Sequence, residues 1–260
     1  MVSTASKKRL SEVRALLTVK GRRDQRRFAF EGPTLLQEAV HAALAIDAIY
    51  VTDQAGAQPI VRECAGRGVP MYRLTDAEMR SISDVETPSG IVAVAPARQT
   101  ALDVLFGAPG CVLVLAAVND PGNAGTLVRA AEAFGARGVV FGAGGVAPYH
   151  PKVVRSAMGS LFRLSIAVAT PASLARATRA WDVTGLEPAG VPLVQLAWTD
   201  RTAIVVGSER HGLGAWREAC TRAAAIPMPG SAESLNAAVA GAIALYEYST
   251  RRPCQDSVSR

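Results

Sequence analysis

The segment Cys111–Val118 is an unbroken run of eight apolar residues, bounded by Gly110 and Asn119. A run of this length without polar alternation is typical of a strand that is buried on both faces of a parallel sheet. Parallel neighbours need a crossover connection, usually a helix, so the flanking sequence has to alternate between strands and helices. The run is too short to cross a bilayer. It therefore predicts an α/β domain.

Helical and strand patterns alternate through the rest of the second half of the chain. Residues 125–135 place Leu127, Val128, Ala131 and Phe134 on one side of a helix. Further strands are expected at 138–144, 164–170, 181–188, 203–209 and 223–228, and further helices at 151–162, 171–180, 214–222 and 234–252. This order predicts a doubly wound parallel sheet with helices on both faces.

A smaller unit with the same alternation precedes it. Strands are expected at 28–31, 45–52, 69–74 and 90–96, and helices at 33–44, 59–68 and 75–83. The stretch Pro96–Gly110 interrupts the pattern with two prolines and two glycines, so we place the domain boundary there, at 97–109. We therefore expect a domain at 1–96, a linker at 97–109 and a domain at 110–260, which suits a chain of 260 residues.

Positive charge is concentrated at the start of the chain. Residues 1–27 contain nine basic and two acidic side chains, a local charge of +7, and the whole chain carries +6, so the other 233 residues sum to −1. A basic cluster at one end is typical of an arm that contacts nucleic acid or an anionic surface; a solvated terminus is the alternative. An arm that binds nucleic acid would use Lys7, Lys8, Arg9, Arg22, Arg23, Arg26 and Arg27. Deleting residues 1–20 should then weaken nucleic-acid binding and flatten its salt dependence.

Cysteine spacing and hydropathy exclude several classes of protein. The four cysteines lie far apart without a C-x-x-C pair, so neither a zinc site nor a disulfide framework is indicated, and we expect no metal. The charged start lacks the apolar stretch of a signal peptide, and no apolar run is long enough to span a membrane. We therefore expect a cytoplasmic protein with no membrane partner.

Two loops follow buried strands and combine glycines with polar side chains. Residues 119–125, NDPGNAG, lead into a helix whose N-terminus can bind phosphate or carboxylate, and Arg129 lies one turn further on. A nicotinamide site would need G-x-G-x-x-G and an acid at the end of the next strand, and the spacing here is wrong. Residues 204–214 form the second loop, where Glu209 occupies the carboxyl end of a strand. We interpret His211 in that loop as an ordinary surface residue.

The third loop, residues 226–236, leaves a strand and enters the last helix, which Ser231 or Ser234 can cap. In this order and spacing, NDPGNAGTLVRAAEAFG, IVVGSERHGLG and IPMPGSAESLNAAVAGAIALYE resemble the three motifs of the SpoU (TrmH-type) RNA ribose 2′-O-methyltransferases of the SPOUT superfamily. The resemblance covers residues 110–247. The front part, with R-F-x-F-E-G at 27–32 and TPSGIVAVA at 87–95, resembles the L30e-type substrate-binding domain of such enzymes.

The resemblance implies a C-terminal domain with a deep trefoil knot that binds S-adenosylmethionine, and a homodimer whose active sites use both chains. It assigns cofactor binding, largely through backbone groups, to Gly207, Ile226, Met228 and Leu235. It assigns the catalytic positions to Asn123, Arg129, Glu209, Ser234 and Asn236. The chain departs from the family at Ala237–Ala238, where Val-Ser is common after the asparagine, and so lacks a hydroxyl at the start of the last helix.

The implied reaction transfers the cofactor's methyl group to a ribose 2′-hydroxyl of structured RNA and releases S-adenosylhomocysteine. Arg129 either removes the hydroxyl proton or binds the adjacent phosphate and lowers the pKa of the hydroxyl, because arginine is a poor base. The additional domain and the basic start favour 23S ribosomal RNA over transfer RNA, and an antibiotic-resistance enzyme is one possible subtype. The alternatives are a transfer RNA methyltransferase of this family, a non-catalytic RNA-binding protein with the same fold, and a nicotinamide enzyme.

Overall fold

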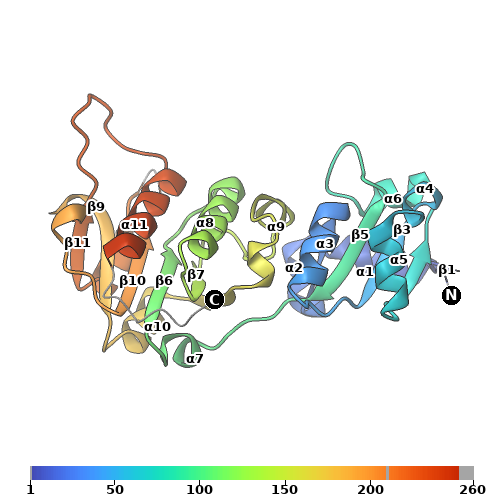
Figure 1. The fold of residues 1–260 in the computed structure, drawn as a ribbon, viewed down its shortest axis with the longest axis horizontal. Helices are drawn as coiled ribbons and strands as arrows, with labels where there is room; N and C mark the ends of the chain where they lie inside the picture. The colour runs from blue at the N-terminus through green and yellow to red at the C-terminus, as the bar shows by residue number, and fades with distance from the viewer. Residues whose placement is uncertain (1, 209–210, 252–260) are drawn as a thin grey trace. The chain divides into compact units, whose positions relative to one another are not determined.

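The computed structural model describes residues 2–208 and 211–251, which form two α/β units (Figure 1). One unit contains the chain up to Arg98 together with Ala147–Arg163, and the other contains Gln99–Val146 and the chain from Leu164 onward. Within the described residues, no helix has both the length and the apolar character that crossing a membrane requires. The predicted α/β class is confirmed in both units.

The second unit is built on a six-stranded sheet with the strand order β11, β9, β10, β6, β7, β8, and all its pairs are parallel. The strands are β6 (Gly110–Leu115), β7 (Gly138–Gly142), β8 (Ser165–Ala169), β9 (Asp182–Pro192), β10 (Arg201–Val206) and β11 (Arg222–Ala225). The apolar run forms β6 between β7 and β10, and its side chains from Cys111 to Ala116 are fully buried. This arrangement confirms the strand buried on both faces.

Helices cover both faces of this sheet. α8 (Pro121–Ala133) and α11 (Ala237–Arg251) pack against each other, over β7 and β10 respectively (Figure 1). The core on the opposite face includes α7 (Leu102–Phe106), α10 (Pro171–Ala177) and the 3-10 helix η3 (Gly214–Ala219). A second 3-10 helix, η2 (Leu193–Gln195), precedes β10. Gly241 allows the close contact of α11 with α8, because a side chain there would collide with Leu127.

Several predicted elements differ from the structure in their limits. The expected helix at 151–162 is divided into α9 (Pro151–Ser156) and the 3-10 helix η1 (Ser160–Phe162), because Met158 and Gly159 have φ of +49° and +90°. The expected helix at 214–222 is the shorter η3, and the expected linker at 97–109 contains α7. Leu105 and Phe106 of α7 are buried in the core of the second unit.

The first unit has a five-stranded mixed sheet with the order β1 (Val2–Thr4), β4 (Met71–Arg73), β3 (Ala48–Val51), β5 (Ile91–Pro96), β2 (Arg27–Glu31). β5 is antiparallel to both of its neighbours, and the other pairs are parallel. Its helices include α3 (Pro33–His41), α4 (Asp53–Gly56), α5 (Pro59–Gly66) and α6 (Asp76–Ile82). A capping box between Thr75 and Glu78 fixes the start of α6.

The basic start of the chain is helical and is folded into this unit. It forms α1 (Lys7–Ala15) and α2 (Val19–Gln25), each capped by a hydroxyl side chain. Leu10, Val13 and Leu16 recur every three residues between the charges, and all three are buried in a core cluster with Tyr50 and Met79. This helical spacing places the three apolar side chains on one face of the segment, which explains why the basic start of the chain folds as helices against the core.

Residues 147–163, which we expected in the second domain, pack in the first unit. Tyr149 stacks on Phe28 with ring centroids 4.5 Å apart, and Phe162 lies 5.2 Å from Phe30. The Tyr149 hydroxyl donates to the carbonyl of Arg98. A segment inserted between β7 and β8 thus completes the core of the N-terminal unit.

Candidate active site

The three predicted loops leave the same edge of the six-stranded sheet. β6 and β10 are parallel neighbours that stay in register up to Leu115 and Val206, and the Ala116 amide donates to the Val206 carbonyl at 2.8 Å. β11 runs parallel to them beyond β9. Because the carboxyl ends of parallel strands meet at one edge, the loops after β6, β10 and β11 converge there, where open α/β sheets bind ligands.

The first loop places Asn123 in the first turn of α8. Asp120 caps this helix by accepting a hydrogen bond of 2.7 Å from the Asn123 amide, and Pro121 occupies the first helical position. α8 therefore begins at Pro121, earlier than the expected residue 125. The predicted glycine-rich loop is largely the start of a helix.

The third loop brings Asn236 to Asn123. The Asn236 side-chain carbonyl accepts hydrogen bonds from the amides of Ala238 and Val239, at 2.9 and 3.3 Å, and so caps α11. Its side-chain amide donates to Oδ1 of Asn123 at 3.1 Å. Two predicted catalytic residues that are 113 positions apart in the chain are therefore in direct contact. The cap forms without the hydroxyl that Ala237–Ala238 lacks.

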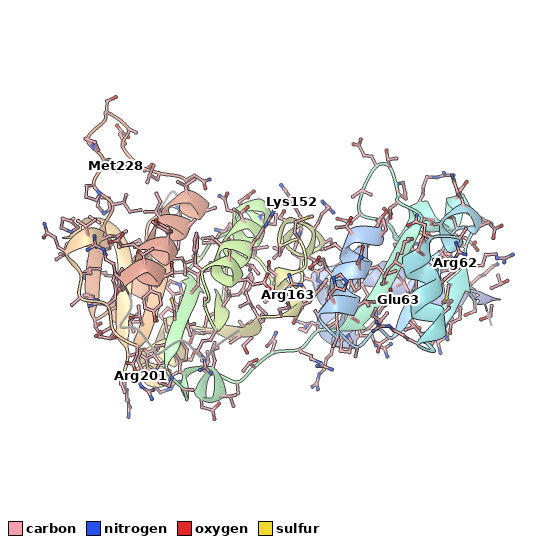
Figure 2. All side chains as sticks on the ribbon, viewed as in Figure 1. Arg62, Glu63, Lys152, Arg163, Arg201 and Met228 are labelled. Atoms are coloured by element: carbon pink, nitrogen blue, oxygen red, sulfur yellow. The ribbon has the colours of Figure 1, made fainter. Side chains whose placement is uncertain are left out.

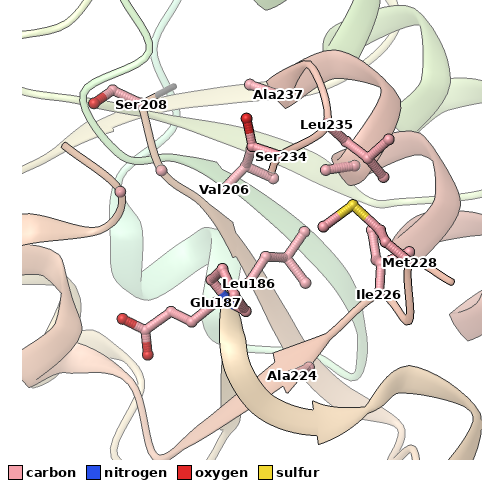
Figure 3. A pocket seen from close by; sticks show the side chains of 14 residues that line it. Leu186, Glu187, Val206, Ser208, Ala224, Ile226, Met228, Ser234, Leu235 and Ala237 are labelled. Carbon is pink, nitrogen blue, oxygen red and sulfur yellow. The ribbon is translucent and has the colours of Figure 1, made fainter. Parts of the chain in front are cut away.

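A cavity of about 290 Å³ lies among the loops. All four predicted cofactor residues line it, namely Gly207, Ile226, Met228 and Leu235, and so does Ser234. Met228 belongs to the long connection between β11 and α11 (Figure 2). In the close view, Ile226, Met228 and Leu235 lie on one side, and Glu187 and Ser208 on the other (Figure 3). The cavity thus has an apolar wall and a polar rim, as small-ligand sites usually do.

Glycine is required at position 207 for a structural reason that the sequence did not indicate. The backbones of Ser208 and Gly212 exchange hydrogen bonds of 2.9 Å, which folds the second loop back over β10. A Cβ on Gly207 would collide with the backbone of Gly212. Glycine here is needed for the loop's own closure as well as for any approach of a ligand.

The remaining predicted catalytic positions differ in what the structure shows of them. Arg129 is exposed on α8, and within the described residues its side chain has no hydrogen bond or ion pair. Ser234 lines the cavity and is itself exposed to solvent. Glu209 lies outside the described residues. The backbone amide of His211 donates to the Ser208 hydroxyl at 3.1 Å, and His211 is exposed.

The basic residues predicted to bind RNA divide by their exposure. Lys7, Lys8, Arg23, Arg26 and Arg27 are exposed, whereas Arg9 is half-buried with its guanidinium 4.2 Å from the centre of the Tyr72 ring. Arg27 pairs with Asp47 at 2.8 Å and Arg23 with Asp24 at 3.3 Å.

The prediction for Arg22 is wrong. Its side chain is buried and donates to the carbonyls of Leu16 and Leu17 at 2.8 and 3.0 Å, which joins α2 to the end of α1. Burial also lowers the pKa of this guanidinium. The residue therefore stabilises the fold and presents no charge to RNA.

The sequence analysis did not single out the cavity residues that β9 supplies, which are Leu186, Glu187 and Pro188. The motif loops gave no signal for them, because β9 is an ordinary strand in sequence. They reach the cavity through an irregularity in the sheet: Gly185 pairs with Ala223, but the next residue of β11, Ala224, pairs with Val191.

Comparison with known proteins assigns the chain to a family. The family described as SpoU rRNA Methylase matches residues 110–246, and the MRM3-like substrate binding domain matches residues 7–93. A 23S rRNA (guanosine(2553)-2′-O)-methyltransferase of Bacillus subtilis is 30% identical over 250 residues, covering 94% of this chain and 97% of that protein.

Solved structures of other methyltransferases are similar to this chain over nearly its whole length. The SpoU methyltransferase AviRb from Streptomyces viridochromogenes, in complex with AdoMet, has a TM-score of 0.84 and 28% identity, covering 94% of this chain and 98% of that one. An AdoMet-bound rRNA methyltransferase from Sinorhizobium meliloti has a TM-score of 0.83 and 27% identity, with 95% of both chains covered. With its family match over more than half of its residues, this chain belongs to the SpoU rRNA methylase family.

Proposed function

We propose that the protein transfers a methyl group from S-adenosylmethionine to a ribose 2′-hydroxyl of 23S ribosomal RNA, in the cytoplasm. The contact between Asn123 and Asn236 carries the proposal. Asn236 stands between Leu235 and Ala237, which both line the cavity, so the predicted catalytic pair and the predicted cofactor residues form one site. The relatives' names support the substrate, since they act on 23S rRNA ribose.

The cavity suits the cofactor in size and chemistry. Leu186, Ile226, Met228 and Leu235 supply an apolar surface that can cover a flat purine. Ser208 and Glu187 supply hydrogen-bonding groups at the opposite side, and Ser234 adds a hydroxyl to the lining. The bound cofactor would supply an electrophilic methyl group and leave as S-adenosylhomocysteine. The family's trefoil knot around the loops is part of this proposal.

The chain's own residues would position the ribose and stabilise its oxygen as it loses a proton. The guanidinium group matches the geometry of phosphate oxygens, so the exposure of Arg129 favours contact with the RNA phosphate over direct proton removal. The bond between Asn123 and Asn236 fixes the start of α8, and with it the turn that carries Arg129. Positioning of this kind can lower a barrier by about 7–11 kcal/mol in well-oriented systems.

The N-terminal unit would bind the RNA. It matches a substrate binding domain, and Lys7, Lys8 and Arg26 expose cationic side chains on it. Each phosphate that such a side chain neutralises releases counterions, so binding should weaken as salt rises. This unit favours ribosomal RNA over the smaller transfer RNA as substrate.

A homodimer is part of the proposal, with α8 and α11 as its contact face. A groove on this face is lined by both catalytic asparagines and by Phe134, Val239, Ile243 and Tyr246. Val239, Ile243 and Tyr246 are 47%, 38% and 55% exposed, unusually high values for three apolar neighbours on one helix. A second chain seated here would cover them and complete the active site.

The central test compares Arg129→Ala with Arg176→Ala, an exposed arginine on α10 that serves as the matched control. We expect Arg129→Ala to lose methyl transfer to 23S rRNA by at least about 100-fold and to keep S-adenosylhomocysteine binding by calorimetry. Near-normal turnover of Arg129→Ala would refute the assignment. Absence of cofactor binding by the unaltered protein would favour a non-catalytic RNA-binding protein, and transfer to transfer RNA alone would favour the other substrate.

The dimer is tested by light scattering of Ile243→Asp beside Val104→Asp, an exposed valine of α7. The first variant should have the mass of a monomer, and the control should stay dimeric. A monomeric mass for the unaltered protein would exclude the dimer.

A further inference from the structure

We propose that Glu187 is a specificity residue that accepts hydrogen bonds from the ribose hydroxyls of the adenosyl cofactor. This inference rests on the proposed function. Glu187 belongs to none of the three motif loops, yet it lines the cavity together with its neighbours Leu186 and Pro188.

An interruption of the β-ladder brings Glu187 to the cavity. β9 pairs with β11 at Gly185 and again at Val191, and these two positions face consecutive residues of β11. Residues 186–190 are therefore extra residues that leave the ladder. Irregularities of this kind redirect side chains and are common beside active sites. Gly190, the last of these extra residues, packs so tightly on the backbone of Ala224 that a side chain at position 190 would collide with it.

Arg217 holds the carboxylate and compensates its charge. Its Nε lies 2.7 Å from Oε2 of Glu187, and the Glu187 side chain is only 30% exposed. Within the described residues, Arg217 is the partner of Glu187, so Oε1 keeps its capacity to accept hydrogen bonds from a ligand. The pair as a whole carries no net charge, which suits neutral hydroxyl donors better than a cationic ammonium group.

The position of Glu187 relative to the apolar wall indicates which hydroxyls it meets. Ile226, Met228 and Leu235 lie on one side of the cavity and Glu187 on the other (Figure 3), while Leu186, the preceding residue, adds to the apolar surface. A purine on that surface is joined directly to its ribose, whereas the amino-acid end of the cofactor is several bonds further away. A carboxylate is an acceptor-only group, and nucleotide-binding sheets use one at a strand end to bind ribose hydroxyls.

The test measures binding of S-adenosylhomocysteine and of its 2′-deoxy and 3′-deoxy analogues by calorimetry. Glu187→Ala should weaken binding of the parent ligand by about 10- to 100-fold, the range for hydrogen bonds to a charged group. For at least one deoxy analogue the same substitution should change the affinity by less than about threefold, because the donor is already missing. Glu218→Ala, an exposed acid of η3 outside the cavity, is the matched control and should change nothing.

5′-Methylthioadenosine, which keeps the ribose and lacks the amino-acid end, separates the two parts of the ligand. Its affinity should fall with Glu187→Ala by a similar factor to that of the parent ligand. An unchanged affinity for this compound, or equal losses for the parent and both deoxy analogues, would overturn the inference and leave the proposed function intact. If the unaltered protein bound none of these compounds, the proposed function itself would fail. Unchanged thermal unfolding of Glu187→Ala would show that the variant is folded.

Discussion

Removal of residues 1–20 should unfold the N-terminal unit, which is a stronger effect than the loss of a charged arm. Leu10, Val13 and Leu16 are 8%, 3% and 2% exposed. Burial of such a side chain contributes about 1.5–3 kcal/mol, so the three together contribute about 5–9 kcal/mol. The deletion also removes β1, which pairs with β4. A whole domain is stable by only about 5–15 kcal/mol.

The assay is urea unfolding followed by circular dichroism, with limited proteolysis to locate the loss. The protein without residues 1–20 should lose the urea unfolding transition of its first unit, and protease should cut it within residues 21–98. The comparison is Lys7→Gln/Lys8→Gln, which removes two exposed charges. This variant should keep its unfolding free energy within about 0.5 kcal/mol, and its RNA affinity should lose up to about 1.8 units of slope against log salt. A deleted protein that unfolds cooperatively at the original urea concentration would refute the reasoning.

Two further predictions concern single side chains. Asn236→Ala should destabilise the protein by about 1–2 kcal/mol through the lost cap, whereas Asn236→Asp, which can still cap α11, should keep most of that stability and lose methyl transfer; equal destabilisation in urea unfolding would contradict this. Burial lowers the pKa of His150, and the nearby charge of Arg22 lowers it further. The Nδ1 atom of His150 accepts a hydrogen bond from the backbone amide of Lys152. The unfolded chain then binds more protons at low pH. The contribution of His150 to stability is therefore fully present above about pH 6.5 and is lost as the pH falls. His150→Asn should flatten this dependence between pH 5 and 7, and an unchanged slope would contradict the assignment.

The sheet of the second unit could be predicted because its sequence signal is local. Eight consecutive apolar residues at Cys111–Val118 leave few alternatives to a buried strand. The helical start of the chain was missed because charge dominated the interpretation, although Leu10, Val13 and Leu16 have helical spacing. The division of the helix after Pro151 was missed for another reason. Met158 adopts a positive φ that its residue type does not predict, and Gly159 lies so close to Glu38 that a side chain there would collide with it.

The site also shows which residues can be predicted from the sequence and which cannot. Motif positions predicted which side chains would gather, and Asn123 and Asn236 do so. Glu187 could not be found in this way, because it reaches the cavity through a mismatch in pairing between β9 and β11. Register between distant strands is a property of the assembled sheet, and a single sequence gives no pattern for it.

The departure at Ala237–Ala238 becomes understandable once the two hydrogen-bonding ends of Asn236 are considered separately. Its carbonyl caps α11, whose first turn supplies Ala237 and Ala240 to the cavity, and its amide holds Asn123 at the start of α8. Since one side chain fixes both helix starts, a hydroxyl after it is not needed for the cap. Ala237 instead leaves room at the cavity wall, and Ala238 lines the groove on the other side of the helix start. A larger residue at 237 should therefore reduce cofactor affinity, because Ala237 borders the cavity directly and is only 6% exposed, so that the added atoms would enter the cavity.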